Sequence, residues 1–290
     1  MRTLSLSSLL VAICLLAAPG LSAQQYFELG VQGGDMPYNG DLSEPGIGFL
    51  KDWNTYGGFY LRYRPISRVG FRFNGIFGQI AAEQQTSTRD ATGASVAIDR
   101  NFQSRIREFS LGLEFDLFYL GDPEDRFVAP YIMAGIGRTS FNPQSERDGR
   151  FYDLQPLRTE GQGIPGGEYD PAPYELAITT FHVGGGVRAK LGERFVLGGE
   201  VSGRVTGTDY LDDVTGRRIN YNDVLTNSAN PGDRSLAAYF SNPAVEPGEA
   251  PDNLEYSRGG QSNDFYFLIN LTLGIRLGGW GGGGDGCYSF

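Results

Sequence analysis

Cysteine and histidine are scarce in this sequence. Its 290 residues include two cysteines, Cys14 and Cys287, and one histidine, His182. Cys14 falls in the apolar leader described below, so the mature chain keeps one thiol and cannot form an internal disulfide. Clusters of Cys and His that bind zinc or similar metals are excluded as well. We therefore expect no cystine framework, no metal and no other cofactor.

Long apolar runs are missing after the first 23 residues. Arg2 precedes an uncharged stretch at 4–18, and Ala23 offers a small residue for cleavage. This apolar core is shorter than the roughly 20 residues that a membrane-spanning helix needs, and its flanks are typical of a secretory leader. The sequence therefore predicts a signal peptide over 1–23. Acylation of Cys14 is disfavoured, because this residue lies inside the apolar core.

The sequence has fewer basic than acidic residues, and it lacks helical periodicity. The net charge of −10 becomes about −11 once Arg2 is removed with the leader, so bulk electrostatics will not attract nucleic acid or anionic lipid. No convincing run of apolar residues at i, i+3, i+4 and i+7 occurs in the mature chain. What is abundant is glycine, with 43 residues, beside 19 Phe and 16 Tyr. This mixture favours strands and turns, because glycine weakens helices by about 1 kcal/mol relative to alanine.

Alternation of apolar and polar residues is clearest at 109–119 and 265–277. Six further segments with strand character lie at 26–33, 56–64, 68–80, 127–139, 175–191 and 194–205. Short connections at 65–67, 121–126 and 192–193 alternate with long, polar ones at 34–55, 81–104, 140–174 and 206–263. Bacterial outer-membrane barrels have short periplasmic turns and longer outer loops in this order.

We therefore predict an all-β fold, an eight-stranded antiparallel transmembrane β-barrel over 24–277 in the cell outer membrane. The barrel must close, because membrane lipid offers no partner to a free backbone N–H or C=O. Long extracellular loops, short periplasmic turns and a Gly-rich periplasmic tail at 278–290 complete the domain organisation.

The polar rows of these strands point into the barrel. The charged members of this inward set are Arg62, Arg72, Glu114, Asp116, Arg188, Glu200, Arg204 and Arg276. An eight-stranded barrel has room only for its own side chains or one small ligand. We interpret the set as a network of paired charges that fills the lumen; a narrow conduit is the alternative. His182 also faces inward without a serine two residues away, so we expect a lumen residue, no catalytic site and no enzyme.

Other side chains receive structural interpretations. Aromatic residues near the strand ends are expected in the interfacial girdle: Tyr26, Phe27, Tyr63, Tyr119, Phe127 and Phe195. Close carboxylates in loops, such as Asp212 and Asp213, are interpreted as solvated, because the spacing of an EF-hand is missing. Cys287 lies alone on the tail, which indicates either a disulfide to a partner protein or a free thiol. It is the one candidate partner-docking residue.

The two ends of the mature chain resemble a known family. The segments FELGVQGG at 27–34, YNGDL at 38–42 and RGGQSNDFYF at 258–267, together with Cys287, are similar to those of PorG-like outer-membrane barrels of Bacteroidota. The loop at 206–263 and the glycines before Cys287 depart from that pattern. The resemblance implies a structural or assembly component of the type IX secretion system that docks a periplasmic ring containing a lipoprotein, with no catalytic residues to transfer.

Two other classes of function stay open. A small barrel could use its long outer loops for ligand or surface binding, or for limited transport. A lipid-modifying enzyme would have to use His182. In every case outer-membrane lipid surrounds the strands.

Overall fold

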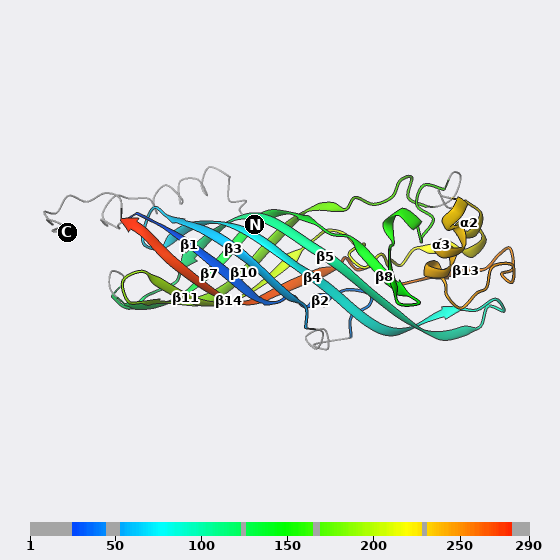
Figure 1. The fold of residues 1–290 in the computed structure, drawn as a ribbon, viewed down its shortest axis with the longest axis horizontal. Helices are drawn as coiled ribbons and strands as arrows, with labels where there is room; N and C mark the ends of the chain where they lie inside the picture. The colour runs from blue at the N-terminus through cyan, green and yellow to red at the C-terminus, as the bar shows by residue number, and fades with distance from the viewer. Residues whose placement is uncertain (1–24, 45–52, 123–125, 165–168, 228–230, 280–290) are drawn as a thin grey trace, which may run out of the picture.

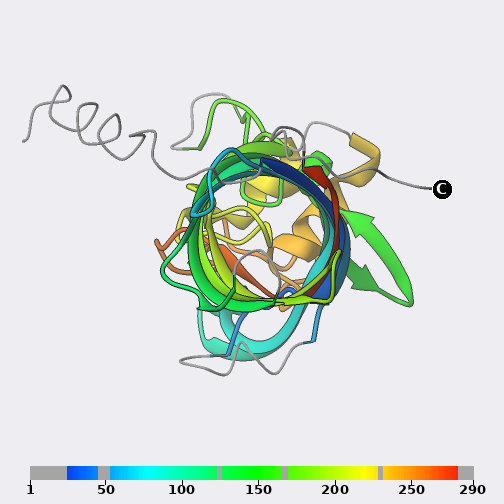
Figure 2. The ribbon, with the colours of Figure 1, turned by 90° about the vertical axis from the view of Figure 1, so that its left-hand side faces the viewer.

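A computed structural model describes residues 25–44, 53–122, 126–164, 169–227 and 231–279. The predicted signal peptide at 1–23 and Cys287 lie outside the described residues. The long strands are β1 (Tyr26–Asp35), β3 (Thr55–Arg64), β4 (Val69–Arg89), β5 (Ser95–Asp116), β7 (Phe127–Ser140), β10 (Ala177–Leu191), β11 (Phe195–Val205) and β14 (Phe265–Gly279). Each pairs antiparallel with the next, and β14 returns to β1, so the ring closes as Figure 2 shows. The prediction of eight antiparallel strands is confirmed.

Six of the eight strands start and end within a few residues of their predicted bounds. The exceptions are β4 and β5, because 81–104 was predicted to be a loop. Their pairing runs without a break from Val69 opposite Phe115 to Arg89 opposite Ser95, and a tight turn at 90–94 joins them. Figure 1 shows this hairpin continuing past the barrel. Its outward face is polar and its inward face mixes polar residues with apolar ones such as Ala82 and Phe102, so no regular apolar row marked it as a strand pair.

The outward face of the ring is an apolar belt. Leu111 is 62% exposed and Leu271 68% exposed, and apolar side chains from every barrel strand surround them. So large an exposed apolar surface is what lipid covers, and the protein is therefore an outer-membrane β-barrel. The short turns and the free ends of β1 and β14 lie at the same end, which is the periplasmic one by the usual arrangement of such barrels.

The opposite, extracellular end carries a folded cap, which we define as the described residues of 141–176 and 206–264. Its elements are β8 (Pro143–Arg147), β9 (Arg150–Asp153), η2 (Gln155–Leu157), β12 (Arg218–Asn220), α2 (Tyr221–Asn227), η3 (Pro231–Asp233), α3 (Arg234–Ser241) and β13 (Glu255–Ser257). The short strands β2 (Tyr38–Asn39) and β6 (Leu120–Gly121) pair with β14 and β7. The sequence predicted no helices, and α2 and α3 are too short, at 7 and 8 residues, for helical periodicity to show. No helix in the described part of the chain is long and apolar enough to span a membrane.

Two apolar clusters organise this end of the molecule. One fills the extracellular mouth of the barrel with inward residues such as Ile76, Ile80 and Ile106, which pack with Leu211 of the cap. The other holds the cap together around α2, α3 and β13. The cap is therefore packed onto the mouth of the barrel and has a core of its own.

Candidate functional site: the sealed lumen and the cap

Glu114 stands at the centre of the charged lumen. Its carboxylate is contacted by the guanidinium groups of Arg62 at 2.7 Å, Arg188 at 3.2 Å, Arg72 at 3.3 Å and Arg64 at 3.4 Å. Three further carboxylates complete the network: Asp116 pairs with Arg64 and Arg188, Glu28 with Arg62, and Glu200 with Arg72. These side chains are at most 2% exposed, so solvent reaches the network from neither end.

The predicted paired network is thus confirmed, and it is larger than expected. Glu28 and Arg64 belong to it, and both lie on the inward rows of strands whose alternation was visible in the sequence. Of the predicted inward set, Arg204 pairs separately with Glu108 at 3.3 Å, and Arg276 forms no ion pair among the described residues. Its guanidinium lies 4.1 Å from the Tyr26 ring centre and 5.0 Å from that of Phe127. It contacts aromatic rings in place of a carboxylate.

Three of the six predicted girdle aromatics do not lie in the girdle. Phe127 is only 3% exposed and turns into the lumen, and Tyr26 lies under Arg276. Strand β5 ends at Asp116, so Tyr119 lies beyond the alternating part of the strand. Its hydroxyl donates a hydrogen bond to the Asp116 carboxylate. The prediction is correct for the remaining three: the Phe27 ring stacks on that of Tyr63, with centroids 4.9 Å apart, and Phe195 is exposed.

His182 lies inside the barrel, as predicted. Its ring is buried against two glycines of neighbouring strands, and a Cβ atom at Gly135 would come within 2.5 Å of it. Its Nδ1 atom has no hydrogen-bond partner among the described residues, so no serine is activated through that atom. A cavity of about 10 Å³ nearby, lined by Gln32 and Arg204 among others, has room for about one water molecule. A lipid substrate cannot reach this histidine.

Two of the segments that carry the family resemblance, 38–42 and 258–267, meet at the extracellular mouth. Strand β2, within 38–42, pairs with the start of β14, within 258–267. The Tyr38 hydroxyl donates a hydrogen bond to Asp264 at 3.1 Å, and the backbone N–H of Gly260 donates one to Asp41 at 2.8 Å. These contacts hold 38–42, in the first outer loop, against the end of the cap and the start of β14.

Asp212 and Asp213 were interpreted as solvated, and this is wrong. Both are buried in the cap. The Asp212 carboxylate accepts hydrogen bonds from the Tyr38 hydroxyl at 2.6 Å and the Val214 N–H at 2.9 Å. Asp213 forms an ion pair with Arg258 at 3.1 Å. These carboxylates are buried because the loop that carries them folds back over the barrel mouth, which the local sequence does not indicate.

The same packing shifts the pKa values of several cap carboxyls. Burial raises the pKa of Glu160 to about 7, against the opposing effect of Arg258. Burial and then the neighbouring Asp41 raise the pKa of Asp209 to about 7. For Asp264, burial followed by the charge of Asp212 raises the pKa well above its ordinary value. Among the described residues, however, no three His, Cys, Asp or Glu side chains are placed to hold a metal ion.

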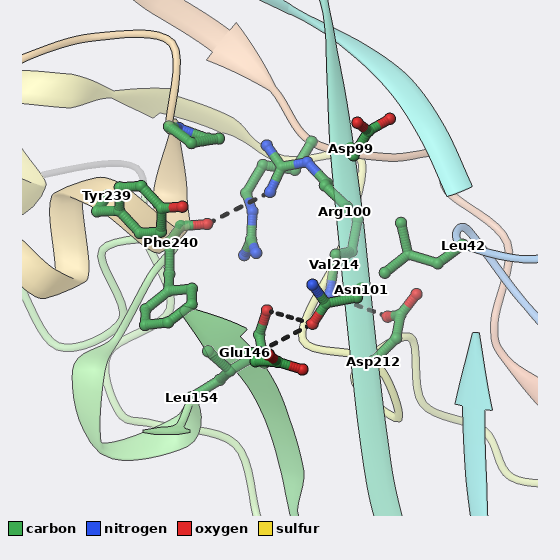
Figure 3. A pocket seen from close by; sticks show the side chains of 13 residues that line it. Leu42, Asp99, Arg100, Asn101, Glu146, Leu154, Asp212, Val214, Tyr239 and Phe240 are labelled. Atoms are coloured by element: carbon green, nitrogen blue, oxygen red, sulfur yellow. Dashed lines mark hydrogen bonds between the residues drawn. The ribbon is translucent and has the colours of Figure 1, made fainter. Parts of the chain in front are cut away.

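A cavity of about 70 Å³ lies between the outer part of β5, β8 and the cap (Figure 3). Arg100 spans it and donates hydrogen bonds to the backbone carbonyls of Phe240 at 3.3 Å and Ser241 at 3.1 Å. Burial lowers the pKa of this guanidinium to about 9. Asn101 accepts a hydrogen bond from the Glu146 N–H at 2.8 Å. These contacts attach the barrel hairpin to the cap, and the cavity between them has room for several water molecules.

Comparison with protein families places the chain. Residues 7–159 match the family described as a domain of unknown function, DUF6089. The chain belongs to the DUF6089 family. The match covers barrel strands β1 to β7 and ends after η2 of the cap, so β10, β11 and β14 lie beyond it. The description of the DUF6089 family names no secretion system, and the resemblance to PorG-like barrels stays a prediction. No curated protein matches the sequence.

Solved structures similar to this DUF6089 chain are outer-membrane barrels of low sequence identity. The N-terminal β-barrel domain of Pseudomonas aeruginosa OprF has 10% identity and a TM-score of 0.36, over 88% of this chain and 98% of that one. The outer membrane protein OprG of the same organism has 12% identity and a TM-score of 0.37, over 89% and 98%. Ail of Yersinia pestis, in complex with sucrose octasulfate, has 10% identity and a TM-score of 0.32, over 87% and 97%. The barrel assignment rests on the strand pairing above.

Proposed function

We propose that the protein is a structural component of an outer-membrane secretion machine, of type IX by its resemblance to PorG-like barrels, and that it anchors a periplasmic partner. The observation that carries the proposal is the sealed lumen. Four arginines and four carboxylates neutralise one another across its width, and an apolar cluster fills the extracellular mouth. A barrel closed in this way serves as an anchor, because it offers no path to a solute.

The test is a pull-down from mild detergent. An affinity tag inserted between Thr92 and Gly93, at the exposed tip of the β4–β5 hairpin, keeps the tag away from the periplasmic face. We expect periplasmic proteins of a secretion complex to co-purify. Non-reducing gels should show a larger, thiol-sensitive species that disappears in Cys287→Ser. Purification without any periplasmic protein would reject the anchoring role, whereas an unchanged Cys287→Ser pattern would reject only the covalent link.

The cap favours one alternative, recognition of a ligand or surface outside the cell. Beside the hairpin lies an open groove of about 680 Å³, lined by Trp53, Phe151 and Tyr239. Trp53 is 79% exposed, which is unusual for an indole without a partner. If this role is correct, Trp53→Ala with Phe151→Ala will abolish surface binding by whole cells and leave the periplasmic pull-down unchanged.

A further inference from the structure

Three arginines stand on the lipid-facing side of the barrel, at the upper edge of the apolar belt. Arg105 and Arg107 follow Phe109 toward the cell exterior on the outward row of β5, and Arg138 follows Ile136 on the adjacent strand β7. The first outward positions above the belt on four other strands carry no charge. They are Gly33 on β1, Gly57 on β3, Gln79 on β4 and Thr179 on β10. Positive charge therefore gathers on one side of the barrel.

These arginines are poorly neutralised, unlike those of the lumen. Within the described part of the chain, Arg105 and Arg107 are exposed and form no ion pair. Arg138 lies 3.7 Å from Glu175, but the two side chains are 58% and 82% exposed. Such a solvated pair contributes little and is readily exchanged for a stronger partner. The cluster thus has capacity for an anion even though the whole chain is acidic.

Aromatic side chains lie directly beside the cluster on the membrane side. In the strand register Arg107 lies opposite Phe77, and Arg138 lies opposite Phe109. The Phe77 and Phe109 rings are 5.8 Å apart in an edge-to-face contact, and Phe73 stacks on Phe109 at 6.2 Å. This patch is apolar and faces the lipid, with Phe77 and Phe109 44% and 47% exposed, so acyl chains can pack against it.

On the exterior side the cluster borders a row of amides. Gln103, two residues beyond Arg105 on β5, accepts a hydrogen bond from Gln79 at 3.2 Å and donates one to Gln144 of β8 at 3.1 Å. Amides of this kind can exchange hydrogen bonds with sugar hydroxyls. From the membrane outward, the wall therefore presents aromatic rings, then guanidinium groups, then amides.

We propose that this wall binds the phosphorylated glycolipid of the outer leaflet. Its acyl chains pack on Phe73, Phe77 and Phe109, its phosphates receive hydrogen bonds from the arginines, and its sugars meet the amide row. Guanidinium groups suit phosphate because they donate two parallel hydrogen bonds. The outer leaflet is indicated because the cluster lies at the end of the barrel that carries the long loops.

The test uses the full mature protein in a non-ionic detergent, with native mass spectrometry to count bound lipid. The probe is purified diphosphorylated lipid A, and its dephosphorylated form and phosphatidylglycerol serve as comparisons. We expect the triple variant R105Q/R107Q/R138Q to bind lipid A roughly 10- to 100-fold more weakly, because each basic side chain near a charged head group contributes to binding. The control R89Q/R150Q/R218Q removes the same charge from exposed arginines of the hairpin and cap and should bind like the wild type.

Three results would overturn the proposal. Equal lipid A binding by the wild type and the triple variant would exclude the arginines. Equal binding of phosphorylated and dephosphorylated lipid A by the wild type would exclude phosphate recognition, and this comparison needs no variant to fold. Equal binding of phosphatidylglycerol would show a general site for anionic lipid and would exclude selection of the glycolipid.

Discussion

Removal of one carboxylate from the lumen tests the charge network most directly. In the network around Glu114, four arginines face Glu28, Glu114, Asp116 and Glu200, so the buried charges balance. Glu114→Gln keeps the shape but leaves a net positive charge among side chains that water does not reach. Breaking a buried ion pair by removal of one partner costs about 3–5 kcal/mol. We expect a loss of this size in the free energy of unfolding, measured by urea titration in detergent micelles with the gel shift between folded and unfolded barrel.

Two further variants test whether the lost charge balance causes the destabilisation of Glu114→Gln. Glu255→Gln is the matched control, because Glu255 pairs with one arginine, Arg218, at 3.5 Å on the exposed surface of the cap, and should lose much less stability. Glu114→Gln combined with Arg72→Met restores neutrality and should be less destabilised than the sum of the two single variants. A loss below about 1 kcal/mol for Glu114→Gln, in the range of a surface pair, would refute the reasoning.

Three other predictions concern the cap, the close contact between barrel strands at Gly135, and the apolar belt. Because burial raises the pKa of Glu160 from 4.5 to about 7, its contribution to stability is present below pH 4.5 and is lost as the pH rises through 7. The protection factors of cap amides, which are corrected for the intrinsic rise of exchange with pH, should therefore fall between pH 5 and pH 8 in the wild type. Constant protection factors would contradict this assignment, as would an equal fall in Glu160→Gln. Gly135→Ala should destabilise the barrel by about 1–3 kcal/mol, since its Cβ would lie 2.2 Å from a backbone carbonyl oxygen, whereas Gly57→Ala meets open space and should be neutral in the same urea titration. Leu111→Arg, in the belt, should cost about 2–4 kcal/mol in folding into lipid vesicles, and Thr55→Arg, at the outer end of β3, should cost much less; equal losses would show that the belt does not face lipid.

The alternation of residues made the barrel wall predictable from the sequence. Leu111 and Leu113 face lipid while Glu114 and Asp116 face the lumen, and a strand that separates two such different environments must show a period of two. For the same reason the short turns, the strand number and most of the inward charges followed from the residues. Arg64 and Glu28 could have been included by the same signal.

Beyond the membrane this signal ends, and tertiary packing decided the rest. The outer parts of β4 and β5 face water on one side, and on the other they mix polar residues with apolar ones such as Phe102, so the alternation at 81–104 is too irregular to indicate a paired hairpin. Asp212 and Asp213 stand in a polar, acidic segment, and only its return over the barrel mouth buries them beside Tyr38 and Arg258. The inward turn of Phe127 likewise depends on how β7 enters the ring. In the barrel wall, lipid and lumen alternate from one residue to the next, so the local sequence is enough to predict which side a residue faces. In the cap, each side chain packs against residues that are distant in the sequence, so only the tertiary structure shows whether it is buried.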